Sequence, residues 1–372
     1  MKSRFAALAL VLLGICFSYQ SSANSTTTTY LTDTTLQKQK GSWVALPVLY
    51  YSPETRLGFG VLGMHLFKPR GADTLTRTSN IQAYVLYTIN KQLLISPRYT
   101  IFFPQDKYTL QGNLAYFSFP QFYYCIGNKL PEENEELVDY TLFRLENKFM
   151  KKLTPAIFAG PQWNYYQVYD VVPVAEGLLE TTKPNGWNGY RASGLGLVAA
   201  YDTRDVVVNP SGGAFLEVST TFNTSFFGSE YRFSRYNLDA RRYFTLNKKG
   251  HVLALQGIAQ LTSGDVPFLE HPALGGDRIM RGYYEGRYRD KQHLAAQAEY
   301  RAPLFWRIGA VAFAGLGEVA PSLDRFELDE VKPSYGLGLR FLVNKAERVN
   351  IRLDYGWGKD TSGFYLEITE AF

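Results

Sequence analysis

The stretch Val349–Trp357 reads VNIRLDYGW and alternates without a break. Its odd-numbered positions are all apolar or aromatic, and its even-numbered positions are polar or glycine. Successive side chains of a β-strand point to opposite faces, so one face of this segment suits lipid and the other suits water. The stretch therefore predicts a long amphipathic β-strand.

The same alternation recurs at Thr109–Tyr116, Phe143–Phe149, Leu294–Arg301 and Ser334–Phe341. A soluble β-sandwich alternates as well. However, the strand candidates run to about 10–13 residues, whereas globular strands are nearer five or six and tilted transmembrane strands need about 9–11. Aromatic pairs also lie at strand ends, as interfacial girdles require. We predict an all-β fold, a transmembrane antiparallel β-barrel of about 16 strands over residues 43–372.

The N-terminus has the pattern of a secretory signal peptide: a basic start, an apolar run of about 13 residues, then small polar residues. We assign 1–23 to this signal and 24–42, rich in Ser and Thr, to a periplasmic leader. A membrane anchor and lipidation at Cys16 are the alternatives. The apolar run is shorter than the roughly 20 residues that a spanning helix needs, which favours cleavage.

Composition narrows the function classes. The formal charge of +5 is too small to argue for nucleic acid. Beyond the signal only Cys125 remains, so no intramolecular disulfide is expected. The sequence has four histidines and no short hydrolase or metal motif, although a Ser–His lipase barrel would need none. We expect a protein that is not an enzyme and binds no cofactor or metal.

Connection lengths give the orientation of the barrel. With the N-terminus in the periplasm, the long connections near 120–137, 168–189, 263–291 and 319–332 all fall on the extracellular side, as bacterial barrels prefer. Two periplasmic connections, near 67–78 and 203–212, are longer than this rule prefers. The expected location is the bacterial outer membrane, with its lipid as one partner.

Four stretches share their order and spacing with a known family. They are Tyr201–Gly213 (YDTRDVVVNPSGG), Gly275–Tyr283 (GGDRIMRGY), Glu299–Leu304 (EYRAPL) and Gly336–Phe341 (GLGLRF). They resemble, in turn, a periplasmic turn, the signature loop and two strands of the BamA/TamA superfamily, the bacterial surface antigen family. The resemblance covers about residues 190–372, and from 41 to 190 only the architecture matches.

The resemblance implies roles for particular residues. In the signature loop, Arg281, Gly282 and Tyr283 are expected to fold into the lumen. A buried guanidinium requires acidic partners. The candidate lumen partners of the loop are Glu299, our first choice for Arg281, then Asp354 and Glu318, together with the basic Arg340. The periplasmic-turn motif consists of Asp202, Arg204, Asp205, Pro210 and Gly212. The remaining loop cations Arg287, Arg289 and Lys291 are expected in solvent.

The chain departs from the family pattern in two places. The family carries Phe-x-Asp-x-Gly on its thirteenth strand, where this chain has Gly315 in place of the aspartate, so another carboxylate must serve. Assembly and translocation members also carry periplasmic receptor (POTRA) modules, which bind clients by strand addition. The segment of about 19 residues between Ala23 and Trp43 is too short for one.

The function implied by the resemblance is insertion or export of proteins or lipids through a weak seam between the first and last strands. Client membrane proteins, or a separate periplasmic subunit, are the partners this implies. The last predicted strand, 363–372, would present Phe364, Leu366, Ile368 and Phe372 to lipid, with Glu370 breaking the pattern. Phe372 would also serve as a C-terminal assembly signal. The alternative is a plugged barrel that binds a partner or forms a narrow pore.

Overall fold

The computed structural model describes residues 41–52, 56–73, 75–131 and 133–372. The expected signal peptide, 1–23, and the leader up to residue 40 lie outside the described residues. Within them, sixteen strands form one antiparallel sheet in sequence order. These strands are β1 (Ser42–Ser52), β2 (Arg56–Phe67), β3 (Ser79–Thr88), β4 (Leu93–Phe102), β5 (Tyr108–Tyr123), β6 (Glu136–Lys152), β7 (Ile157–Val172), β8 (Tyr190–Asp202), β9 (Gly213–Asn223), β10 (Phe233–Thr245), β11 (Val252–Gly264), β14 (Gln292–Phe305), β15 (Ile308–Ala320), β16 (Lys332–Asn344), β17 (Val349–Gly358) and β18 (Thr361–Ile368).

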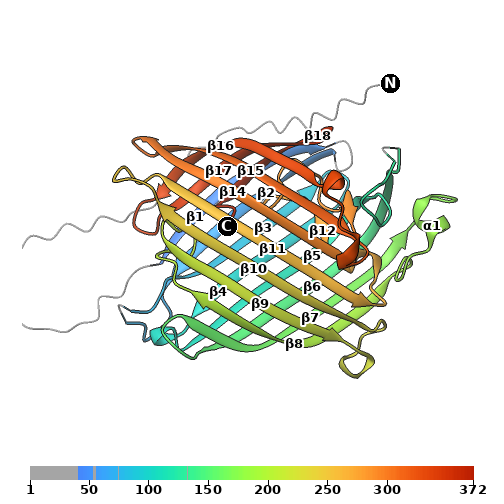
Figure 1. Cartoon of the computed structure of the whole chain (residues 1–372), viewed down its shortest axis with the longest axis horizontal. Coiled ribbons are helices and arrows are strands. Elements are labelled where there is room, and N and C mark those ends of the chain that lie inside the picture. Colours follow the sequence, from blue (N-terminus) through green and yellow to red (C-terminus); the bar gives the residue numbers. More distant parts are fainter. Residues whose placement is uncertain (1–40, 53–55, 74, 132) are drawn as a thin grey trace, which may run out of the picture.

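The short elements lie in the connections. A two-stranded sheet of β12 (Ala273–Leu274) and β13 (Tyr288–Arg289) belongs to the long connection between β11 and β14. The helix α1 (Leu178–Thr182) stands beyond one rim of the barrel in Figure 1. No helix in the described ranges is long and apolar enough to cross a membrane. The 3-10 turns are η1 (Pro104–Asp106), η2 (Ser225–Phe227), η3 (Phe268–Glu270), η4 (Leu323–Arg325) and η5 (Leu328–Glu330).

The alternation of the sequence becomes the two faces of the barrel wall. On β17, Arg352 and Asp354 are buried in the interior, whereas Tyr355 is 40% exposed on the outside. On β16, Ser334 and Arg340 face inward and Leu337 faces outward at 60% exposure. An apolar outer face and a polar lumen are what a membrane barrel requires. The fold class and the sixteen-stranded sheet predicted from the sequence are therefore confirmed.

The last strand is shorter than predicted, because β18 ends at Ile368 and not at Phe372. Thr369 adopts a left-handed backbone conformation with φ 79°, which turns the chain out of the sheet. The tail, which we define as Thr369–Phe372, is buried in the lumen, and Phe372 is only 4% exposed. The end of the chain accordingly lies within the outline of the barrel in Figure 1. The expectation that Phe372 faces lipid is wrong.

The two outer members of the sheet, β1 and β18, share no backbone ladder among the described residues. Instead, side chains close the seam. Leu46 on the inward face of β1 and Leu62 and Met64 on the inward face of β2 pack in one apolar cluster with Ile351 and Ile368. Ile351 and Ile368 are Cα partners on the outward face of β17 and β18. The first hairpin therefore overlaps the last two strands from outside, and β18 lies tucked beneath it.

Candidate functional site in the barrel lumen

The signature loop, residues 275–287, leaves the rim through the β12–β13 hairpin and descends along the inner wall. Met280, fully buried with φ 53°, packs with Leu274, Tyr283, Ala295 and Val319. This apolar contact anchors the turn just before the arginine. The buried turn thereby holds the next residue against the inner face of β14 and β15.

Arg281 lies at the centre of the site with no exposed surface. Its Nη2 donates to Glu299 Oε2 at 2.6 Å, and its Nη1 donates to Asp354 Oδ2 at 2.5 Å. The guanidinium also lies over the ring of Phe313, 3.6 Å from its centroid. Two buried carboxylates and an aromatic face satisfy the charge that burial would otherwise make costly.

The two residues that follow fasten the loop to the wall. Gly282 has φ 111°, and a Cβ added there would lie 2.6 Å from the backbone carbon of Trp357. Only glycine fits a backbone that approaches another backbone so closely in this conformation. The Gly282 amide donates to the Tyr365 hydroxyl at 2.8 Å, and the Tyr283 hydroxyl donates to the Pro333 carbonyl at 2.8 Å.

Charged residues of β14, β16 and β17 form a continuous network that receives the loop. We call Glu299, Arg301, Arg340, Arg352 and Asp354 the wall cluster. Arg301 Nε donates to Glu299 at 2.8 Å, and Arg340 Nη1 donates to Asp354 at 2.6 Å. Arg352 Nη1 donates to Asp354 at 3.0 Å. Three guanidinium groups thus share two carboxylates, and every member is at most 8% exposed.

The candidate partners of the loop divide into three groups. Glu299 and Asp354 bind Arg281 directly, and Glu299 was the first choice. Arg340 reaches the loop through those two carboxylates. Glu318 is a correction, because it pairs with Leu294 on the outward face of the wall.

Glu318 serves a different loop. Its Oε1 accepts hydrogen bonds from the Asn128 side chain at 3.4 Å and from the Glu327 amide at 3.1 Å. The carboxylate therefore joins the connection before β6 to the connection after β15. An apolar residue such as Phe313 is normally taken to face lipid, and alternation along the strand then places Glu318 inward. Phe313 instead faces the lumen, so Glu318 faces outward.

Gly315, which stands where the family pattern has an aspartate, leaves space for a side chain of the signature loop. A Cβ added at Gly315 would lie 3.5 Å from the sulfur of Met280, and one at Gly317 would lie 3.1 Å from it. The two glycines make room for the methionine that precedes Arg281. Asp354 and Glu299 supply the negative charge that the family pattern places on this strand.

The periplasmic-turn motif lies at the opposite end of the strands from the extracellular loops. Arg204 binds Asp202 through Nε at 2.9 Å and lies over the ring of Phe215, and Arg77 donates to the same Asp202 at 2.7 Å. Arg77 also binds Asp106 at 2.7 Å. The two periplasmic connections that are unusually long for a barrel therefore meet at Asp202.

The second half of the motif reaches across to the last strands. Asp205 accepts hydrogen bonds from the Ser211 amide at 2.9 Å and the Gly212 amide at 3.3 Å, and it pairs with Arg348 at 2.8 Å. The Pro210 carbonyl accepts from Arg301 Nη1 at 3.3 Å. Burial acts to raise the pKa of Asp205, but the Ser211, Gly212 and Arg348 contacts outweigh it and hold the pKa at about 2.

Sequence reasoning missed part of the site. Glu370 of the tail accepts from Arg340 Nε at 2.6 Å and from Asn350 Nδ2 at 2.6 Å. The signal was present, because a carboxylate at this position interrupts the lipid-facing pattern of the last segment. Arg289, expected in solvent, is 8% exposed and donates to the Phe268 carbonyl at 3.1 Å. Arg287 is also engaged, through Nη2 to the Pro131 carbonyl at 2.9 Å.

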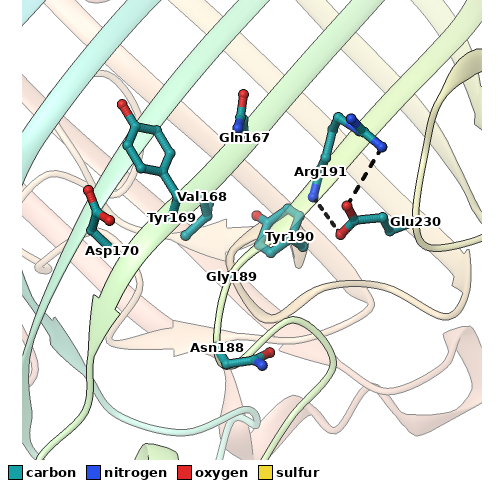
Figure 2. Close-up of a pocket in the computed structure, with 9 residues that line it drawn as sticks. All are labelled: Gln167, Val168, Tyr169, Asp170, Asn188, Gly189, Tyr190, Arg191 and Glu230. Carbon is teal, nitrogen blue, oxygen red and sulfur yellow. Dashed lines mark hydrogen bonds and ion pairs between the residues drawn. The ribbon is translucent and has the colours of Figure 1, made fainter.

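An open pocket of about 320 Å³ lies at the extracellular rim between the end of β7, the start of β8 and the connection before β10. Figure 2 shows Arg191 and Glu230 paired at one side of it, 3.8 Å apart, and Asp170 at the other. Within the described residues, no group of three or more His, Cys, Asp or Glu side chains is placed to hold a metal ion. The pocket has the polar, solvent-facing character of a rim.

Comparisons with known proteins give the same picture as the geometry. A family model of the Omp85 superfamily domain matches residues 93–372. The structure is similar to BamA from Haemophilus ducreyi lacking POTRA domains 1–3, with TM-score 0.53 and 14% identity, covering 89% of this chain and 68% of that one. It is also similar to CdiB from Escherichia coli, with TM-score 0.54 and 11% identity, covering 88% of this chain and 62% of that one.

At these identities the solved structures establish the barrel fold only. A search of curated proteins finds no match to the sequence. The family model spans most of the chain, and it includes both the lumen loop and the periplasmic turn. This chain belongs to the Omp85 superfamily and is a protein of the bacterial outer membrane.

Proposed function

We propose that this barrel acts in outer-membrane biogenesis, by inserting or exporting proteins or lipids through the seam between β1 and β18. The observation that carries the proposal is the seam itself. The edges of β1 and β18 share no ladder among the described residues, and an apolar cluster with a few side-chain hydrogen bonds holds the overlap. Unpaired backbone groups at membrane depth favour pairing with another strand.

The loop and the wall cluster support this proposal because they make one side of the seam rigid. They brace β14, β16 and β17 against one another by buried ion pairs, while β1 and β2 carry an apolar inner face at the overlap. One side of the seam is therefore fixed by ion pairs, and the other is held mainly by apolar packing. The role is non-enzymatic. Outer-membrane lipid, client membrane proteins or a separate periplasmic subunit are the proposed partners.

A disulfide staple across the overlap tests the proposal. Asn344 Nδ2 donates to Ser42 Oγ at 2.9 Å, which joins β16 to β1. The double variant Ser42→Cys/Asn344→Cys, in a Cys125→Ala background, should fix the overlap when oxidised. The test measures the levels of other barrels and of surface lipid in the outer membrane of the cells. Oxidation should change those levels as depletion does, and reductant should restore them.

The matched control places the same bond within a paired ladder. Ser219 and Asn237 are Cα partners on β9 and β10, with side chains 3.5 Å apart. Ser219→Cys/Asn237→Cys should form its disulfide without any effect on the outer membrane. If depletion of the protein leaves barrels and surface lipid unchanged, or if both staples act alike, the proposed role fails.

One observation favours a second function, a plugged barrel that serves as a scaffold. The lumen holds the signature loop and the tail, both in buried contact with the wall. Single-channel recording in planar bilayers separates the functions. A steady open conductance indicates a pore, whereas a closed or briefly opening barrel agrees with a plugged lumen. A scaffold would also keep its partner with the seam stapled.

A further inference from the structure

The tail Thr369–Phe372 occupies a formed site on the inner wall, outside the β-sheet. Glu370 is 5% exposed, and its carboxylate receives Arg340 and Asn350, each at 2.6 Å. The main-chain oxygen of Phe372 accepts from Arg301 Nη2 at 2.9 Å. A carboxylate and a main-chain oxygen two residues further on are therefore both bound by buried side chains.

The aromatic ring of Phe372 has a receptor of its own. It packs with Tyr243 and Ala254 in an apolar cluster, 6.4 Å from the Tyr243 ring centroid. The Arg301 guanidinium lies 5.5 Å from the Phe372 ring. Aromatic and guanidinium neighbours at these distances favour an aromatic ring over an aliphatic side chain.

The backbone amides of the tail make few hydrogen bonds to the rest of the chain. Thr369 donates to the Asn350 carbonyl at 2.8 Å, and the Glu370 amide reaches the Val208 carbonyl at 3.4 Å. The ladder between β17 and β18 stops at Ile368. The tail is therefore recognised mainly through the Glu370 carboxylate, the Phe372 ring and the main-chain oxygen of Phe372. Another extended peptide with the same spacing can present these groups.

The wall requires an acidic ligand at this position. Without Glu370, Arg301 and Arg340 share only Glu299 and Asp354 among the described carboxylates, and both of those also bind Arg281. An unpaired guanidinium in a buried site carries a large desolvation penalty. Any occupant must bring a negative charge to replace the one that leaves.

We propose that the tail site is an exchangeable peptide-binding site, occupied by the chain's own tail when no other ligand is present. Its ligand is an extended segment of another polypeptide with a carboxylate two residues before an aromatic ring. The tethered tail competes at the high effective concentration of an intramolecular ligand. Peptide binding at this site does not depend on whether the barrel inserts proteins or lipids.

The test uses the full-length protein in detergent and a fluorescent peptide, LEITEAF, that copies Leu366–Phe372. The double variant Glu370→Gln/Phe372→Ala weakens the chain's own tail and leaves the receiving side chains intact. Fluorescence anisotropy should show that the peptide binds this variant at least about tenfold more tightly than it binds the wild type, because the internal competitor is lost. Heat-modifiable gel migration verifies that both barrels are folded.

Two controls identify the site. A peptide with Gln and Ala at the positions of Glu370 and Phe372 should lose binding to the weakened variant. Adding Arg340→Gln to that variant should weaken binding of the original peptide while the barrel still migrates as folded. Equal binding to wild type and variant, no binding to the variant, or binding that ignores the peptide carboxylate would each overturn the proposal. None of these results bears on the stapled-seam experiment.

Discussion

Arg281 donates a hydrogen bond to Asp354 at 2.5 Å across 73 residues of sequence, and neither side chain is exposed. Asp354 lies on β17, next to the last strand of the sheet, so this contact fixes the lumen loop to the part of the wall that borders the seam. The same carboxylate binds Arg340 and Arg352. One aspartate thus connects the loop, the wall and, through Arg340, the tail.

Replacing Arg281 should release the loop from the wall. Breaking a buried pair by removing one partner costs about 3–5 kcal/mol, because the remaining charges stay buried and unpaired. Arg281→Ala should make residues 275–287 sensitive to protease and impair function, while the barrel still forms. Limited proteolysis with mass mapping measures this. Arg278→Ala is the matched control, because Arg278 is 43% exposed and its Nε lies 3.8 Å from Asp277. Equal cleavage of both variants would contradict the assigned role.

Gly282→Ala should expel the loop by steric conflict. The new methyl group would overlap the Trp357 backbone at 2.6 Å in a left-handed conformation. Gly228→Ala provides the comparison, because Gly228 has φ 87° with nothing within 4 Å of a Cβ. That change carries only the backbone penalty, about 1–2 kcal/mol. Thermal unfolding should show a clearly larger loss for Gly282→Ala. Similar losses would mean that the close approach to β17 is unimportant.

Glu318→Gln should affect the outside of the barrel and not the lumen. It weakens the contacts to Asn128 and to the Glu327 amide, so residues 321–331 should become easier to cleave. The Arg281 loop should keep its protection, since its own carboxylates are untouched. Limited proteolysis of intact cells or proteoliposomes measures the cleavage of both loops in one experiment. Deprotection of residues 275–287 would restore Glu318 as a lumen residue.

Acid should loosen the extracellular loop at His271. Burial, followed by the positive charges of Arg289 and Lys291, lowers the pKa of His271 from 6.5 to about 4. A folded pKa below the unfolded one means that the loop binds fewer protons when docked. Its stability is therefore complete above about pH 6.5 and is lost as the pH falls toward 4.

Hydrogen exchange of residues 265–291 between pH 7 and pH 4, corrected for the intrinsic pH dependence of exchange, measures this loss. His271→Gln should flatten the dependence, because the glutamine has no charge to gain. An unchanged pH profile in that variant would assign the effect to another group.

Much of this architecture was predictable from residue alternation, because lipid and water sort side chains by parity along each strand. Alternation also placed Glu299 and Asp354 inward, where Arg281 binds them. It failed at Glu318, since β15 turns an aromatic residue, Phe313, inward as a platform for the guanidinium. If every apolar residue of this strand is assumed to face lipid, alternation assigns Glu318 to the lumen, which is the wrong face.

The tail could not be predicted for a different reason. Phe364, Leu366 and Ile368 continue a lipid-facing pattern, and Phe372 extends it by the same period. The chain leaves the sheet at Thr369 because Arg301, Arg340 and Tyr243, from three distant strands, together bind Glu370 and Phe372. Contacts of that range are set by the whole barrel fold and not by local pattern.

The strength of the overlap between the first hairpin and strands β17 and β18 depends on the solvent that surrounds it. Leu46, Leu62 and Ile368 hold it by apolar packing. In water such packing is strong, since separation would hydrate every side chain. In a bilayer the acyl chains are as apolar as leucine, so the hydrophobic driving force for keeping these surfaces together largely vanishes. The membrane that surrounds this protein therefore lowers the apolar part of the free energy needed to separate its first and last strands.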